Sequence, residues 1–156
     1  DSKNVKEKLH FNNKFKVIEI AKHQEQPIDF KKINIDEYVS KDIEKINFGR
    51  IFGTRSGDKG GCANLGVWAK DISSFSYLYH FLTVEQLKKL LPDLACFEIE
   101  RYELPNIFAL NFYVKGILEN GVSSNNRKDG QAKSLGEYLG TKLIDCPKEF
   151  IEKYAN

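Results

Sequence analysis

Residues 95–114 read ACFEIERYELPNIFALNFYV, and this stretch decides which fold the chain can adopt. In its second half, side chains alternate with the period of two that a strand requires, and one face receives Phe108, Leu110, Phe112 and Val114. Residues 95–104 alternate in the same way around Phe97 and Ile99. Pro105-Asn106 separates the two runs, so the sequence predicts two antiparallel strands joined by a two-residue turn.

Two helices are expected just before this hairpin. Residues 71–82 carry apolar side chains at helical spacing. Thr83 and Gln86 match a capping box, in which the hydroxyl accepts the Gln86 amide at the start of a second helix. Pro92 ends that helix, because the residue before a proline is driven out of the helical region.

The remaining elements complete a recognisable order. Residues 46–55 and 65–70 are expected to be strands on either side of a glycine loop, Asp129–Leu139 a helix, and residues 142–146 a strand before a helical tail. If the first two strands are taken as one, the order from residue 46 is βαββαβ. That pattern is the split βαββαβ of a ferredoxin-like α+β sandwich, with an antiparallel sheet and helices on one face.

The N-terminal part of the chain has weaker patterns. We expect residues 1–45 to be an extension, a linker or the end of a larger preceding domain, and residues 46–156 to form the ferredoxin-like domain. Within the extension, residues 1–13 are expected to be a frayed lead-in, residues 15–21 a short strand and Ile35–Ile46 a short helix. The chain has no Met and starts at Asp1, which favours the end of a longer polypeptide.

Composition excludes several classes of protein. The net charge of +2 comes from 24 basic and 22 acidic residues, and such a balance does not favour a nucleic-acid partner. No apolar run approaches the roughly 20 residues of a membrane-spanning helix. The three cysteines match no zinc or redox spacing, so we expect no metal, no cofactor and a reducing, cytoplasmic location.

The glycine loop RSGDKGG, residues 55–61, is the first candidate for chemistry. Backbone amides of a glycine-rich turn can converge on an anion, and Arg55 and Lys59 would add charge-assisted hydrogen bonds to a phosphate or carboxylate. The spacing is not that of a phosphate-binding P-loop. The alternative is a hairpin loop whose glycines adopt positive φ and whose charges are solvated.

Three further polar residues lie among apolar ones. Asn111 interrupts a strand, where asparagine is disfavoured unless its amide has partners or faces solvent. Asp129 is either the cap of the third helix or a catalytic acid, and a helix start beside Arg127 is an anion site. Cys62 beside Lys59 could have a lowered pKa, although no histidine partner can be assigned to it.

Three ordered motifs together point to a family. Arg55–Lys70, Glu103–Phe112 and Gly121–Gly136 resemble the C-terminal domain of AtuA-like proteins, the acyclic terpene utilisation proteins and their relatives. The resemblance covers roughly residues 47–146 and implies a ferredoxin-like domain that follows a much larger domain. It also implies a place in the catabolism of branched acyclic terpenoids through CoA thioesters, and no established catalytic residue.

The resemblance carries over to individual positions of this chain. They are Arg55, Ser56, Gly57, Asp58, Lys59, Gly60 and Asn64 in the first motif, Pro105, Asn106 and Asn111 in the second, and Gly121, Arg127, Asp129 and Lys133 in the third. The chain departs from the pattern at Ser124 and Asn126, where an arginine and an apolar residue are expected, and at Cys62.

Two functions follow from these observations. In the first, Arg55, Lys59 and Arg127 hold the phosphate or carboxylate of a CoA thioester or another anionic small molecule. Asp58 and Lys59 are then the candidate catalytic residues, and the same cleft is lined by Ser56, Gly57, Gly60, Asn64, Asn106, Asn111 and Asp129. In the second, the domain is a non-catalytic assembly module, whose sheet forms a homo-oligomer or packs against a larger N-terminal domain.

Overall fold

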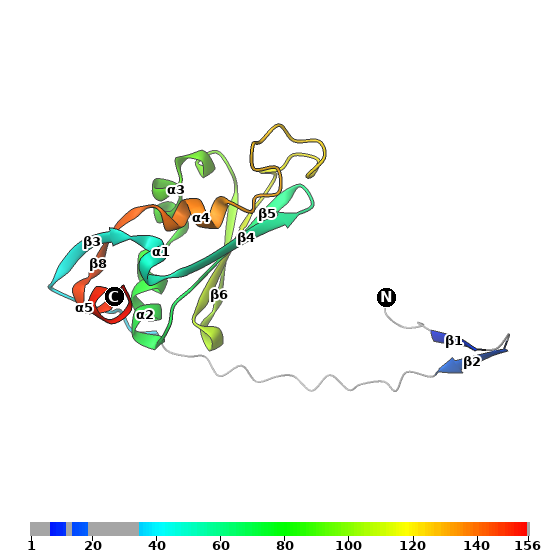
Figure 1. Ribbon diagram of the computed structural model, residues 1–156, viewed down its shortest axis with the longest axis horizontal. Helices are drawn as coiled ribbons and strands as arrows, with labels where there is room; N and C mark the ends of the chain where they lie inside the picture. Colours follow the sequence, from blue (N-terminus) through cyan, green and yellow to red (C-terminus); the bar gives the residue numbers. More distant parts are fainter. Residues whose placement is uncertain (1–6, 12–13, 19–34, 156) are drawn as a thin grey trace. The chain divides into compact units, whose positions relative to one another are not determined.

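The computed structural model describes residues 7–11, 14–18 and 35–155 of the chain. By its internal contacts the chain divides into two compact units, residues 1–32 and residues 33–156. Figure 1 shows the elements of both units.

The described residues of the first unit, 7–11 and 14–18, form a hairpin. β1 (Glu7–Phe11) pairs with β2 (Lys14–Ile18) in antiparallel register. β2 confirms the predicted strand, of which residues 19–21 lie outside the described part. The prediction of a frayed lead-in is wrong over β1, because pairing with β2 gives its backbone a hydrogen-bonded partner.

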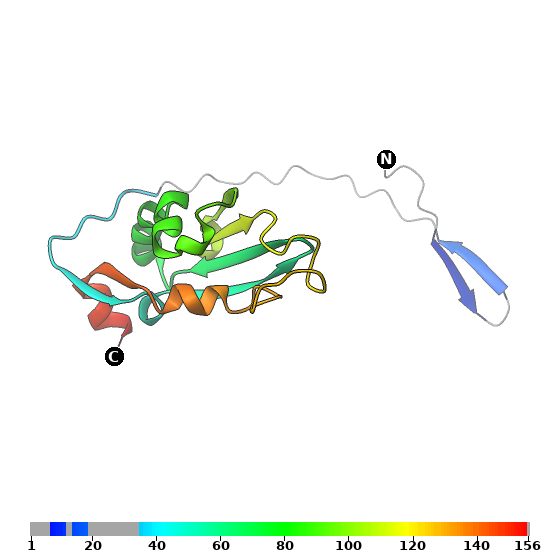
Figure 2. The ribbon, with the colours of Figure 1, turned by 90° about the horizontal axis from the view of Figure 1, so that it is seen from above.

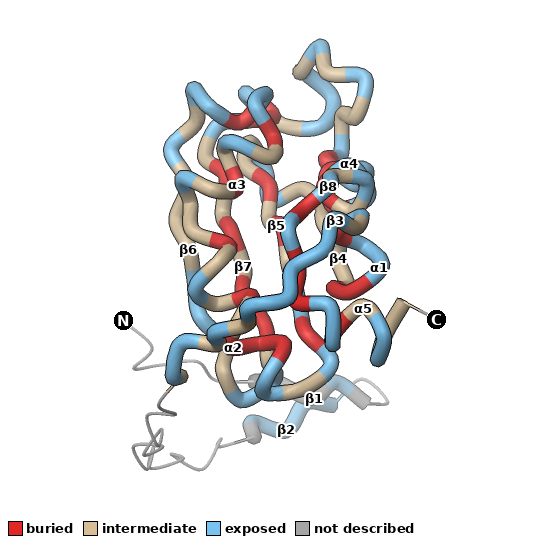
Figure 3. Tube along the Cα trace, turned by 90° about the vertical axis from the view of Figure 1, so that its left-hand side faces the viewer, coloured by how far each residue is buried: buried red, intermediate tan, exposed pale blue. Residues whose placement is uncertain are grey.

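The main sheet of the second unit has four antiparallel strands in the order β4-β5-β7-β6. β4 (Gly53–Lys59) and β5 (Cys62–Trp68) form one hairpin, and β6 (Ile99–Leu104) and β7 (Ala109–Val114) form the other. Figure 3 shows β6, β7, β5 and β4 following one another across the molecule. β5 and β6 are thus parallel with β7 between them, which is the split arrangement of a ferredoxin-like fold.

The predicted alternation in β7 is confirmed. Leu110, Phe112 and Val114 are fully buried, while Asn111 and Tyr113 are only partly covered. The predicted two-residue turn is replaced by a 3-10 turn, η2 (Pro105–Ile107), followed by Phe108 at a φ of 52°. Proline has no amide to donate to the ladder, so the strand ends before it and the connection becomes longer.

Two helices follow β5, as expected. α2 (Ile72–Phe81) is capped by the Asp71 carboxylate, which accepts the Ser74 amide at 2.8 Å. α3 (Val84–Leu90) starts at Thr83, whose hydroxyl accepts the Gln86 amide at 3.1 Å, and a short 3-10 turn, η1 (Pro92–Leu94), follows it. The predicted cap and the predicted stop are therefore confirmed.

The third helix is shorter than predicted. α4 (Leu135–Gly140) does not start at Asp129. The Asp129 carboxylate instead accepts the amides of Lys133 at 2.9 Å and Ser134 at 3.0 Å. These bonds hold residues 129–134 in a loop, because the side chain competes with the helical backbone for the amides.

A second, two-stranded sheet joins distant parts of the chain. β3 (Ile43–Asn47) pairs antiparallel with β8 (Leu143–Pro147), and β8 leads into α5 (Lys148–Tyr154). The last strand and the helical tail are confirmed. The predicted helix at Ile35–Ile46 is wrong, because the backbone of its last residues pairs with β8.

Two corrections concern the start of the domain. The first predicted strand is divided by α1 (Phe48–Ile51), so β3 and β4 are separate, and β4 and β5 are two strands of a hairpin rather than one merged strand. The predicted boundary after residue 45 falls within β3. Residues 35–45 lie in the same unit as the rest of the domain, and the Ser76 hydroxyl donates to the carbonyl of Asp36.

The helices cover one face of the main sheet. Phe75 and Leu78 of α2, Leu87 of α3 and Leu139 of α4 belong to one buried cluster with the inner side chains of β5 and β7. Figure 2 shows α4 alongside β4. The fold is therefore the predicted α+β, ferredoxin-like class with an antiparallel sheet and helices on one face.

Hydrogen bonds fix α4 against β4. The Ser56 hydroxyl accepts the Gly136 amide at 2.9 Å and donates to the Lys133 carbonyl at 3.0 Å. The Thr54 hydroxyl donates to the Gly136 carbonyl at 2.9 Å. A Cβ on Gly136 would lie 3.2 Å from the Arg55 nitrogen, so only glycine allows this approach without displacement.

We expect Ser56→Ala to lower the free energy of unfolding by about 1–2 kcal/mol, because the buried Gly136 amide loses its acceptor. Urea unfolding followed by circular dichroism measures this. The matched control is Ser73→Ala on the exposed surface of α2, which should change stability by no more than about 0.5 kcal/mol. Equal effects of the two substitutions would contradict the role assigned to Ser56.

Candidate functional site

Strand alternation divides the RSGDKGG motif between the two faces of the sheet. Ser56 and Asp58 pair with Leu65 and Ala63, both fully buried on the helix-covered face. Arg55, Gly57 and Lys59 therefore lie on the opposite face, which we call the open face. The structure does not bring Asp58 and Lys59, the two candidate catalytic residues, to one site.

The glycines at the tip of the β4–β5 hairpin have structural tasks. Gly60 has a φ of 64°. A Cβ on Gly61 would lie 2.2 Å from the carbonyl oxygen of Glu119, so the hairpin tip can contact the following loop only because residue 61 is a glycine. The Leu118 amide donates to the Gly61 carbonyl at 2.9 Å and fixes this contact. These two glycines thus match the hairpin-loop alternative.

The second motif contributes residues to both ends of the sheet. Asn111 lies on the open face, where its side-chain oxygen accepts a hydrogen bond from the side-chain NH2 of Asn64 at 3.4 Å. Asn106 lies in η2, at the end of the sheet away from Gly60, and is exposed. The structure therefore brings Asn64 and Asn111 together with Arg55 and Gly57 on the open face and separates Asn106 from them.

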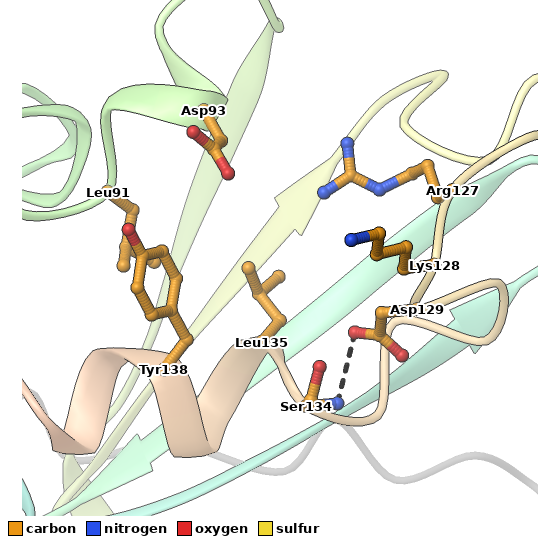
Figure 4. Close-up of a pocket in the computed structure, with 8 residues that line it drawn as sticks. All are labelled: Leu91, Asp93, Arg127, Lys128, Asp129, Ser134, Leu135 and Tyr138. Carbon is orange, nitrogen blue, oxygen red and sulfur yellow. Dashed lines mark hydrogen bonds between the residues drawn. The ribbon is translucent and has the colours of Figure 1, made fainter.

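The third motif lies on the helix side of the sheet. Arg127 and Asp129 line a cavity of about 460 Å³ between the end of α3 and the start of α4. Figure 4 shows the side chains of Arg127 and Lys128 pointing into this cavity, opposite Asp93. Arg55 does not line this cavity but a second one of about 300 Å³, which it shares with Ser56, Lys133 and Glu137 where β4 meets α4. The single cleft of the sequence hypothesis is therefore divided into two places.

The walls of this α3–α4 cavity combine charge and apolar surface. The apolar part consists of the buried Leu91 and Leu135 and the ring of Tyr138, which is 40% exposed. Neither Arg127 nor Lys128 forms an ion pair with any residue that the structure describes. Two cationic groups are consequently available beside an apolar wall.

Asp129 positions this loop rather than neutralising the cations. Both its carboxylate oxygens accept backbone amides, those of Lys133 and Ser134. The Asn125 side chain holds the other end of the loop, since its oxygen accepts the Arg127 amide at 3.1 Å. The backbone on both sides of Lys128 is therefore fixed by side-chain hydrogen bonds.

Several residues of this cavity were not among the sequence candidates. Lys128 follows Arg127 directly, and a pair of adjacent cations beside Asp129 was the available signal. Leu91, Asp93 and Tyr138 could not be found from the sequence, because they contact the cavity only after α3 and α4 have packed side by side.

Cys62 occupies a polar cluster at the hairpin end of the open face. A hydrogen bond from the Tyr113 hydroxyl and a second from the Gly116 amide, at 3.4 Å to the sulfur, lower the pKa of the Cys62 thiol. Lys115 adds positive charge nearby and is itself held by Glu98 at 2.7 Å and Glu100 at 2.6 Å. The same cluster raises the pKa of the Tyr113 hydroxyl.

The four-stranded antiparallel sheet, its split βαβ connection and its single helix-covered face define a ferredoxin-like domain. Residues 46–145 match the model of the AtuA ferredoxin-like domain, and the chain belongs to this family. No curated protein and no solved structure matches the chain.

Two further findings concern the described residues. No three of their His, Cys, Asp and Glu side chains are grouped as a metal ion would require. None of the described helices is both long enough and apolar enough to cross a membrane.

We expect Cys62 to react with iodoacetamide at lower pH than an ordinary thiol. Its lowered pKa means that the reactive thiolate forms earlier as pH rises, so the half-maximal rate in the native chain should occur below that of the same cysteine in urea. Cys146 is fully buried, and burial raises its pKa to about 12, so it should stay unmodified in the native chain. Peptide mapping by mass spectrometry reports both rates, and identical profiles for Cys62 in the native and unfolded chain would contradict the cluster's effect.

Proposed function

We propose that this domain binds an anionic small molecule with an apolar group in the α3–α4 cavity. The observation that carries the proposal is the pair of side chains, Arg127 and Lys128, that point into the cavity without an ion pair among the described residues. A guanidinium can hold a carboxylate or a phosphate through two parallel hydrogen bonds, and a neighbouring ammonium adds a point charge.

The opposite wall suits the remainder of such a ligand. The Tyr138 ring and the slightly exposed Leu135 present apolar surface, and the fully buried Leu91 completes the apolar lining. Lys142 lies 3.7 Å from the centre of that ring, which fixes its orientation by a cation–π contact. A ligand with an acidic end and a short branched apolar chain would place each part against matching surface.

Asp93 makes the charge of the cavity asymmetric. Its exposed carboxylate lies across the opening from Arg127 and Lys128. An anion is therefore attracted to the loop side and repelled from the η1 side, and this asymmetry would orient the ligand.

The family name supports a metabolic setting for this activity. We place the domain in a larger cytoplasmic protein that acts in acyclic terpenoid or branched acyl-CoA catabolism, where the ligand would be a branched acyl-CoA or the corresponding acid. The three free cysteines, Cys62, Cys96 and Cys146, suit a reducing compartment. In this setting the first motif supports the cavity indirectly, because Ser56 holds the start of α4.

We expect Arg127→Gln and Lys128→Gln each to weaken binding of isovaleryl-CoA by roughly tenfold to a hundredfold. Each substitution removes one charge-assisted hydrogen bond, which contributes about 1.5–3 kcal/mol. Isothermal titration calorimetry of the full chain measures this. The control is Lys89→Gln, an exposed cation of α3 that does not line the cavity, which should bind like the original chain.

Separate titrations with isovalerate, with CoA and with inorganic phosphate assign the anion. Binding of isovalerate supports a carboxylate in the cavity, and binding of CoA or phosphate supports a phosphate. The proposal fails if none of these ligands binds at millimolar concentration, or if Lys89→Gln weakens binding as much as Arg127→Gln does.

A further inference from the structure

The open face of the main sheet carries a surface that the ligand proposal does not use. We propose that it binds the open face of a second copy of this chain, related by a two-fold axis that runs parallel to the strands between β5 and β7. The open face consists of every second residue of the four strands, with Arg55, Gly57 and Lys59 on β4, Cys62, Asn64, Gly66 and Trp68 on β5, Ala109, Asn111 and Tyr113 on β7, and Glu100, Tyr102 and Leu104 on β6.

Large apolar side chains are exposed on this face. Trp68 is 42% exposed, Tyr102 50% and Leu104 43%. The Trp68 ring lies against Gly53 of β4, where an added Cβ would be 2.1 Å from the ring. Three such side chains on one side of one sheet indicate an interaction surface rather than scattered surface residues.

Charge is distributed unequally between the two edges of the open face. The β4 edge carries Arg55 and Lys59, whereas the β6 edge carries Glu98 and Glu100, which share the cation Lys115 and leave that edge with a net negative charge. Glu98 continues the β6 edge, since its carbonyl accepts the Lys115 amide at 3.0 Å. A two-fold axis parallel to the strands places β4 of one copy over β6 of the other, so each basic edge meets an acidic edge twice in the dimer.

The strand register extends this match to single positions. An axis parallel to the strands preserves the height along them, so each cross-strand row faces the same row of the second copy. The rows are Lys59–Cys62–Lys115–Glu98, Gly57–Asn64–Tyr113–Glu100, Arg55–Gly66–Asn111–Tyr102 and Gly53–Trp68–Ala109–Leu104. Lys59 then faces Glu98 of the second copy and can form an ion pair with it. Arg55 faces Tyr102 of the second copy and can form a cation–π pair with its ring.

Small residues of one copy also face larger residues of the other. Gly57 faces Glu100 of the second copy, and Gly66 faces its Asn111. A Cβ on Gly57 would meet nothing within 4 Å in its own chain, so the fold itself does not require a glycine there. A glycine with open space in a strand marks a close approach by another group, and the dimer supplies that group.

The size of the face determines the expected affinity. Four strands of about six residues, roughly 4.8 Å apart and rising roughly 3.4 Å per residue, cover roughly 400 Å². Standard interfaces bury about 800 Å² per partner, so this dimer should be weak, dependent on concentration and weakened by salt.

A charge exchange tests the arrangement. The first variant carries Arg55→Glu with Lys59→Glu, and the second carries Glu98→Lys with Glu100→Lys. Each should sediment as a monomer at concentrations at which the original chain dimerises, with at least tenfold weaker self-association, because both edges then carry the same sign. An equimolar mixture of the two variants should form a heterodimer. In it, the acidic β4 edge of the first variant faces the basic β6 edge of the second, and the basic β4 edge of the second faces the acidic β6 edge of the first.

A steric variant and a chemical probe complete the test. Gly57→Leu should fold as a monomer, because its own chain leaves space for a side chain, and should lose self-association. Alkylation of Cys62 should slow as the original chain is concentrated, since the dimer covers the open face.

The proposal is overturned if the original chain remains monomeric at millimolar concentration, or if the mixed variants stay apart while circular dichroism shows both to be folded. Neither outcome affects the ligand cavity, which lies on the other side of the sheet.

Discussion

The alternation of side chains along β4 is the constraint on which the arrangement of this domain depends. Consecutive residues of a strand face opposite sides of the sheet, so the polar motif at residues 55–59 cannot form a single cluster. Ser56 points to the helices and holds Gly136, and through it α4, against the strand. Arg55 and Lys59 point away, to the face that no described helix covers. One motif therefore serves the packing of the domain on one side and its surface on the other.

Close backbone contacts connect this strand to the rest of the fold. Gly61 allows the carbonyl of Glu119 to approach the hairpin tip, and Gly136 allows α4 to approach β4. Between these two contacts the loop carries Arg127 and Lys128, and Asp129 fixes its end through two backbone amides. The position of the two cations is thus set by glycines outside the cavity and by the hydrogen bonds of Asp129, which lines it. In this way the first motif, through Ser56 and Gly61, can affect the cavity although none of its residues lines it.

Prediction from the sequence succeeded where the physical cause is local. The cap at Thr83 and the stop at Pro92 act within a few residues, and the structure confirms both. Prediction failed where pairing is distant. β3 pairs with β8, roughly a hundred residues further along the chain, and nothing in residues 35–46 alone distinguishes this strand from a weak helix. For the same reason, the cavity wall formed by Leu91 and Tyr138 was not foreseen.

The sequence by itself determined the class of fold, the family and the residues rich in chemistry, because periodicity, caps and ordered motifs are properties of neighbouring residues. Only the tertiary structure decided which of those residues meet. It placed Asn64 beside Asn111 and Arg127 beside the apolar side chains of α3 and α4, and it separated Asp58 from Lys59. The reason is that a sheet has two faces. Register and helix packing, which depend on the whole chain, assign each side chain to one of them.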